Sequence, residues 1–245
     1  RLTPEQEAYR AEAQQLIDGY KRFFTTFAKD ISLQFKLSNA FFIDLEKGEV
    51  NLDTKWFAEK GCSKNQILWA HLHELSHFRD LAEDTERVMQ NFSYIRAQAR
   101  RTGAAIMGKW EQKYSGTDPN FIEKLKKQIP TSKKEGAETM NAAERAAYGI
   151  HHIFFNIFDD IFVNNMVARR APQYEQSEEG GKEVERLYRE KLFTPTDYRS
   201  KPRHLQFLYA LLRKEMVKSE QVEITEEVQE VLNTPLRFQG REYTP

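Results

Sequence analysis

The sequence contains a single cysteine, Cys62, among 245 residues. One thiol cannot form an internal disulfide, and this favours a reducing, intracellular setting. No segment approaches the roughly 18 consecutive apolar residues of a membrane-spanning helix, and the first residues show no signal-peptide pattern. The chain begins at Arg1, which is also compatible with a trimmed piece of a longer protein. We expect a cytoplasmic protein with no membrane partner.

Net charge is also lacking, because 37 Lys and Arg residues balance 37 Asp and Glu residues. The chain therefore has no global attraction for nucleic acid or for an anionic membrane. Basic runs occur at 96–101 and 124–134, but acidic residues lie between and around them, which is typical of a solvated helix face. We expect no nucleic-acid partner.

The composition is sufficient for a core, with 40% hydrophobic and 12% aromatic residues. Most of the chain has the pattern of helices, and one short stretch has that of strands. We therefore expect a mainly α protein with a small β-sheet or hairpin (α+β), forming one domain over 1–245. Its expected parts are a hairpin plus motif helix at 30–90, a charged helical insertion at 91–140, a further helix at 141–170 and a helical C-terminal part at 171–245.

The most informative motif is His73-Glu74-Leu75-Ser76-His77, an H-E-x-x-H run. Two histidines four residues apart lie on one face of a helix, where both imidazoles can reach the same metal ion. The adjacent glutamate can then act on a metal-activated water as general base. The alternative is a chance match, with two solvated histidines on a polar helix face.

The surroundings of the motif favour the metal interpretation. Ser63 and Gln66 form a capping-box pattern, and an apolar stripe follows at Leu68, Leu72, Leu75 and Ala82. No proline or glycine interrupts 64–101, so we expect both histidines in the middle of a helix.

A hairpin is expected just before this helix, with strands at 40–45 and 50–53 around a turn at 46–49. An exposed strand edge beside a metal site could align an extended peptide. The alternative is an ordinary hairpin that only buries apolar side chains.

A catalytic zinc normally takes three protein ligands, so a third ligand must be found. Glu83 lies too far along a straight helix. Asp80 and Asp84 on the same face could hold a ligand from behind, but solvated carboxylates are the stronger expectation. The best source is a long helix at 141–170, which Asn141 and Glu144 can cap and which Pro172 follows.

The second half of this helix is apolar around most of its circumference. Helical spacing gathers His152, Asn156, Asp159, Asp160 and Asn164 into one arc, with Asn165 on the far side as the exception. Ionised carboxylates in apolar surroundings are costly unless they are paired or bind a metal. We expect Asp160 to be the third ligand, with Asp159 as the fallback and Asn156 and Asn164 as amides that hold the carboxylate. Salt bridges from the two aspartates to basic side chains are the alternative.

Other expectations concern single residues. His152 could hydrogen-bond a reaction intermediate, although a satisfied core histidine is the stronger expectation. Thr102-Gly103 is expected to break a helix, and Ser200 is expected to cap a helix that starts near Pro202.

With these residues the chain resembles a zincin-like metallopeptidase domain of bacteria and phages, often found beside a von Willebrand factor A-like domain. That family combines H-E-x-x-H with a later N-I-x-x-D-x-x-x-N helix, here Asn156, Ile157, Asp160 and Asn164. The resemblance implies a zincin fold, a Zn²⁺ cofactor, His73, His77 and Asp160 as ligands, and Glu74 as general base. The chain departs from the family in lacking a glycine-histidine pair after the motif.

These observations predict a zinc metallopeptidase that hydrolyses peptide bonds in a peptide or protein substrate. A von Willebrand factor A-like domain or protein is the partner that the resemblance suggests. The alternative is a catalytically inactive metal-binding scaffold or protein-interaction module with a zincin-like fold.

Overall fold

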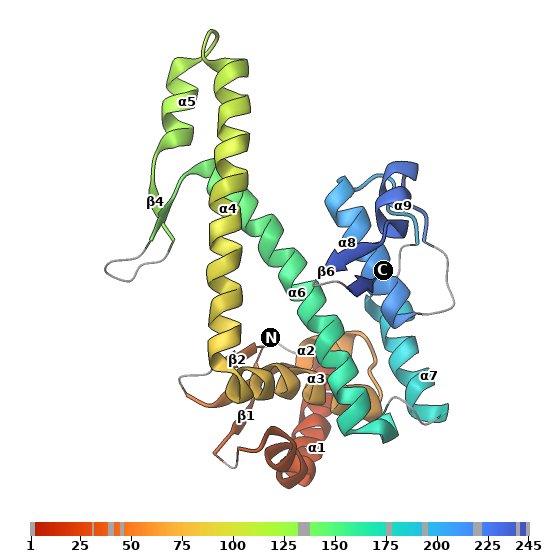
Figure 1. Ribbon diagram of the computed structural model, residues 1–245. Coiled ribbons are helices and arrows are strands. Elements are labelled where there is room, and N and C mark those ends of the chain that lie inside the picture. The colour runs from red at the N-terminus through yellow and green to blue at the C-terminus, as the bar shows by residue number, and fades with distance from the viewer. Residues whose placement is uncertain are drawn as a thin grey trace. The chain divides into compact units, whose positions relative to one another are not determined.

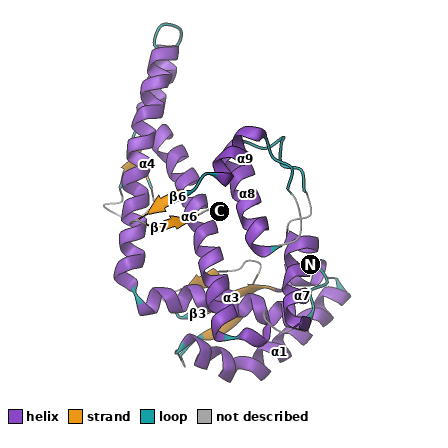
Figure 2. Ribbon diagram, turned by 45° about the vertical axis from the view of Figure 1, so that its right-hand side comes forward, coloured by secondary structure: helices purple, strands orange, loops and turns teal. Residues whose placement is uncertain are grey.

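The computed structural model describes residues 3–30, 32–38, 42–44, 47–131, 138–174, 178–192, 196–217, 222–238 and 241–243. Within these ranges the protein is mainly helical with short strands (Figures 1 and 2), which confirms the expected class. None of the described helices combines the length and apolar character needed to cross a membrane. The chain divides into two compact units, Arg1–Glu83 with Asp159–Pro245, and Asp84–Phe158.

The first unit begins with α1 (Pro4–Ala28), whose start is fixed by a capping box. The Thr3 hydroxyl accepts from the backbone N–H of Gln6 at 3.2 Å, and the Gln6 side chain accepts from the Thr3 N–H at 3.0 Å. These bonds satisfy two amides that a helix start leaves unpaired. Next along the chain are β1 (Gln34–Ser38), β2 (Phe42–Asp44), β3 (Glu49–Asp53), α2 (Thr54–Glu59) and α3 (Lys64–Glu83).

The three strands form one sheet in the order β1-β3-β2. The antiparallel pairing of β2 with β3 confirms the expected hairpin over its described residues, while 40–41 and 45–46 lie outside them. The parallel pairing of β1 with β3 was not expected. Val50 of the central strand is fully buried, so the sheet contributes to the core of this unit.

Helix α3 begins with the expected capping box, in which Ser63 and Gln66 exchange side-chain hydrogen bonds of 3.0 and 3.2 Å. Leu68, Leu72 and Leu75 are buried in the core, as the apolar stripe predicted. The stripe stops there, because the helix ends at Glu83 and Ala82 is exposed.

The C-terminal part of the first unit contains the second half of α6 (Ala142–Arg170), from Asp159 onward. The remaining elements are a 3₁₀ turn (Pro172–Tyr174), α7 (Glu178–Arg186), a π-helical segment (Leu187–Leu192), α8 (Arg203–Met216), α9 (Glu226–Asn233), β6 (Leu236–Phe238) and β7 (Arg241–Tyr243). Val167 and Leu187 join the same core as α1 and α3. The prediction that Ser200 caps α8 was wrong, because Pro202 occupies the cap position and no side chain caps the helix.

The second unit contains α4 (Thr85–Tyr114), α5 (Pro119–Lys126), the paired strands β4 (Ile129–Pro130) and β5 (Thr139–Met140), and the first half of α6. The expected Asn141–Glu144 capping box is present at the start of α6, with bonds of 2.8 and 2.9 Å. The predicted break at Thr102-Gly103 was wrong, because α4 is continuous through both residues. A Cβ at Gly103 would lie 2.6 Å from Cα of Glu144, so this glycine permits close packing of α4 on α6.

Candidate metal centre

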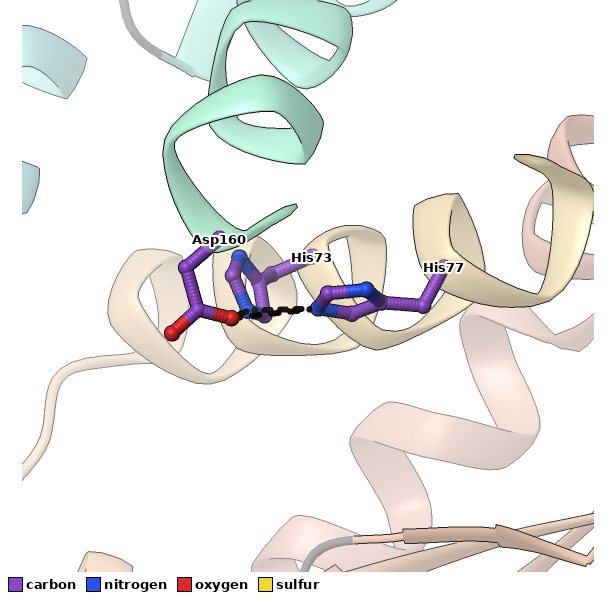
Figure 3. A group of neighbouring side chains, drawn as sticks. All are labelled: His73, His77 and Asp160. Atoms are coloured by element: carbon purple, nitrogen blue, oxygen red, sulfur yellow. Dashed lines mark hydrogen bonds and ion pairs between the residues drawn. The ribbon is translucent and has the colours of Figure 1, made fainter. Parts of the chain in front are cut away.

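Helix α3 presents His73 and His77 on one face, one turn apart (Figure 3). Their Nε2 atoms are 3.2 Å apart. Both rings are half-buried, while Leu72 and Leu75 on the same helix are fully buried in the core. Packing of the apolar residues therefore holds the helix that carries the two imidazoles.

Helix α6 supplies a carboxylate that faces both rings (Figure 3). Oδ1 of Asp160 lies 3.5 Å from Nε2 of His73 and 3.3 Å from Nε2 of His77. The three side chains form a group whose donor atoms could hold one metal ion. The structure thus brings Asp160 to the histidine pair, although it lies more than 80 residues further along the chain.

The spacing of these donor atoms fits a tetrahedral ion. With zinc–ligand bonds of about 2.0–2.1 Å, two ligands of a tetrahedral zinc are about 3.3 Å apart. The three separations here are 3.2, 3.3 and 3.5 Å. A zinc ion could bind all three atoms with little movement of the side chains.

The hydrogen bond at the back of His73 fixes the orientation of its ring. Nδ1 of His73 lies 2.7 Å from Oδ1 of Asn164. The amide nitrogen of Asn164 donates to the Tyr188 hydroxyl at 3.0 Å and to Sδ of Met216 at 3.1 Å, so its oxygen faces the ring. An amide oxygen only accepts, and Nδ1 of His73 is therefore the protonated nitrogen.

His77 is held in the same way by a carboxylate. Its Nδ1 donates to Oδ2 of Asp159 at 2.8 Å. Metal-binding histidines commonly donate their second ring N–H to a carboxylate or a carbonyl oxygen, which orients the ring and raises its basicity. Asp159, which was the fallback ligand, thus contacts Nδ1 of His77 and is not part of the group of three possible metal ligands.

In the state that can bind a metal, both rings are neutral with Nδ1 protonated, and two Nε2 lone pairs point toward each other and toward Asp160. Without an ion, a second proton on His77 separates these atoms. Three electron-rich atoms within 3.5 Å of one another are unfavourable unless a cation or a proton lies among them. The arrangement therefore has the charge pattern of a cation site.

The ionisation of the ion-free site agrees with this pattern. Burial opposes the charged form of His77, but hydrogen bonds with Asp159 and Asp160 outweigh it and raise the pKa of His77 to about 10. Burial likewise opposes the charged form of Asp160, but hydrogen bonds with His73 and His77 outweigh it and lower the pKa of Asp160 to about 2. Negative and positive groups are thus stabilised side by side.

Glu74 lies beside this group, on a cavity of about 370 Å³ that His73 and Asp160 also line. It is half-buried and close enough for its charge to raise the pKa of His77. A carboxylate in this position can exchange a proton with a molecule bound in the cavity. We call this cavity the aromatic cleft; its other described lining residues are Asp53, Trp56, Phe57, Trp69, Ala70, Leu187, Tyr188, Leu192 and Leu212.

The remaining residues of the predicted polar arc have different roles. Asn164 was expected to hold Asp160, but its described hydrogen bonds are with His73, Tyr188 and Met216. Asn156 is exposed, and that it holds Asp160 stays a prediction. His152, in the second unit, is half-buried and packs against the rings of Phe92 and Tyr148.

Of the carboxylates near the end of α3, Asp80 differs from expectation and Glu83 agrees with it. Asp80 was expected to be solvated, but only 9% of it is exposed. Glu83 is not a ligand; it pairs with Arg79 at 2.8 Å, Lys29 at 2.9 Å and Arg170 at 3.0 Å. Hydrogen bonds from Arg79 and Lys29 hold the pKa of Glu83 at about 2. The ion pairs connect the end of α3 with Lys29, just after the end of α1, and with Arg170 at the end of α6.

Three residues of the site were missed at the level of sequence. Tyr188 and Met216 hold the Asn164 amide from 24 and 52 residues further along the chain, and no local pattern marks them. Trp69 packs against the His73 ring, with centroids 5.4 Å apart. Its position one turn before His73 on the same helix was a signal that could have identified it.

Comparison of the chain with protein-family models, with curated proteins and with solved structures found no match.

Proposed function

We propose that the protein is a zinc-dependent metallopeptidase with a zincin-like fold, in which His73, His77 and Asp160 hold the metal and Glu74 is the general base. The observation that carries the proposal is the spacing of 3.2–3.5 Å between two imidazole nitrogens and one carboxylate oxygen, which could all bind one ion. Glu74 lines the same cavity as His73 and Asp160. A general base beside the metal site supports hydrolysis as the reaction.

Zinc bound at such a site lowers the pKa of a coordinated water to about 7 and polarises a carbonyl group. The protein's own part is to position and to transfer protons. Glu74 accepts the proton of the attacking water and then donates a proton to the amine that leaves. Asn164 and Asp159 keep the two imidazoles oriented, with Nε2 of each ring directed at the metal position.

Two histidines and one carboxylate are also the donor set of non-haem iron(II) oxygenases. Tetrahedral donor spacing and the neighbouring Glu74 favour zinc and hydrolysis for this protein. The second candidate is a metal-binding scaffold or interaction module without catalysis, which would need the same three ligands but not Glu74.

The experiment compares Glu74→Gln with wild type for zinc content and for cleavage of an unfolded protein such as casein. We expect one zinc ion per chain in both proteins and cleavage only in wild type. Glu230→Gln, on α9 and exposed, is the matched control and should keep both properties. Zinc binding without cleavage by wild type would support the scaffold, whereas wild-type protein that binds no zinc would exclude both functions.

A further inference from the structure

Most residues that line the aromatic cleft have no part in the proposed zinc site. Eight of its described lining residues are apolar or aromatic, and its polar groups are His73, Glu74, Asp160 and Asp53. Three of these four belong to the proposed catalytic centre. The rest of the cleft therefore presents an apolar surface directly beside the position where a scissile bond would lie.

These walls are rigid because they are part of the core. Phe57, Trp69, Leu187 and Tyr188 each have less than 7% of their surface exposed. Trp69 meets Tyr188 edge to face, with centroids 5.4 Å apart, so neither ring can turn away without losing this contact. A cleft with such walls exists before a ligand arrives, which is typical of small-molecule and side-chain sites.

The charges in the cleft select against acidic groups. No lysine or arginine occurs among its described lining residues, whereas Asp53, Glu74 and Asp160 are all acidic. The Asp53 carboxylate accepts a hydrogen bond of 2.9 Å from the backbone N–H of Trp56 and caps α2. An acidic side chain in the cleft would meet no lysine or arginine among these lining residues and would lie near three carboxylates.

We infer that the aromatic cleft binds a large apolar side chain, aromatic or leucine-like, of the peptide whose neighbouring bond is cleaved. This inference rests on the proposed function and names the substrate class for the same site. The cavity volume of about 370 Å³ lies at the lower end of the range of ligand pockets, roughly 300–1,000 Å³, and suits one large side chain with part of its backbone.

Binding of peptide hydroxamates to the zinc-loaded protein tests the inference without requiring turnover. The hydroxamate group ligates zinc, and a series that differs in one side chain (benzyl, isobutyl, methyl or carboxymethyl) reports on the cleft. Because Trp56 and Trp69 line it, intrinsic fluorescence can follow binding. We expect benzyl or isobutyl compounds to bind about 10- to 100-fold more tightly than methyl, with carboxymethyl the weakest.

A positive charge introduced at an exposed residue of the cleft should favour the carboxymethyl compound and disfavour the benzyl compound. Leu192 lines the cleft and is 43% exposed, so Leu192→Lys should fold normally. The variant should bind the carboxymethyl compound about two- to fivefold more tightly than wild type and the benzyl compound less tightly. Val231→Lys, at an exposed apolar residue of α9 outside the cleft, is the matched control and should change neither affinity.

The outcomes separate the two claims. Cleavage of peptides with no side-chain preference in the hydroxamate series would overturn the inference and leave the peptidase proposal intact. The expected hydroxamate order without cleavage of any peptide would support the apolar site and overturn the peptidase proposal. Equal responses of Leu192→Lys and Val231→Lys, or failure of every hydroxamate to bind zinc-loaded protein, would also overturn the inference.

Discussion

Replacing Asp159 with alanine tests the different roles of the two adjacent aspartates. Asp159 accepts a hydrogen bond from Nδ1 of His77 at 2.8 Å, whereas Asp160 faces both Nε2 atoms. The Asp159→Ala substitution therefore removes the group that orients one imidazole and leaves three donor atoms in place. Zinc should still bind at one ion per chain, but more weakly.

The expected loss can be worked out from this one contact. A hydrogen bond to a charged group contributes about 1.5–3 kcal/mol, and exposure reduces that value. Both side chains are 26% exposed, so we take the lower part of the range. About 1.5–2 kcal/mol corresponds to about a 10- to 30-fold loss of zinc affinity. This agrees with the roughly 10- to 100-fold effects found when groups behind metal ligands are removed.

Competition with a chromophoric zinc chelator at neutral pH measures the affinity. Asp160→Ala removes a donor atom and should weaken binding much more than Asp159→Ala does. Asp18→Asn, at an exposed residue of α1, is a control that should leave zinc affinity unchanged. If Asp159→Ala abolished zinc binding while Asp160→Ala retained it, Asp159 would be the ligand and the reasoning would be refuted.

Three further predictions follow from other contacts. Asn164→Leu should weaken zinc binding about tenfold, because His73 loses the acceptor that orients it, and unchanged affinity in the chelator assay would contradict this role. Gly103→Ala should destabilise the fold by about 1–3 kcal/mol in chemical denaturation, because the new Cβ would meet the Glu144 backbone at 2.6 Å. Gly108→Ala on the same helix meets no atom within 4 Å and should stabilise it by about 0.5–1 kcal/mol, so equal effects would contradict the close approach. Zinc affinity should fall steadily as the pH drops below about 10, because the pKa of His77 in the ion-free site is about 10 and its proton competes with the metal, and equal affinities at about pH 5.5 and 7.5 would contradict this.

Local sequence patterns predicted the parts of the fold that depend on neighbouring residues. The capping boxes predicted at the start of α3 and α6 are both present, because each needs only two side chains three residues apart. The face shared by His73 and His77 follows from helical geometry alone. The polar arc on α6 predicted Asp160 as a ligand, because a carboxylate on an apolar helix needs a cationic partner.

Contacts between distant segments could not be predicted in the same way. The break expected at Gly103 is a site of close packing, and only the position of Glu144 reveals this. Asn164 was assigned to the neighbouring carboxylate on its own helix, but its amide bonds to His73, 91 residues earlier in the chain. The parallel strand β1 was missed because its partner β3 follows β2 in sequence, and a parallel pair has no turn signal.

The central claim is that two imidazoles from α3 and one carboxylate from α6 hold a single zinc ion. A crystal structure of the zinc-loaded protein, with anomalous data collected at the zinc absorption edge, tests it most directly. The account predicts one anomalous peak about 2.0–2.2 Å from Nε2 of His73, Nε2 of His77 and a carboxylate oxygen of Asp160. A peak elsewhere, or no peak among these atoms in protein that contains zinc, would contradict it.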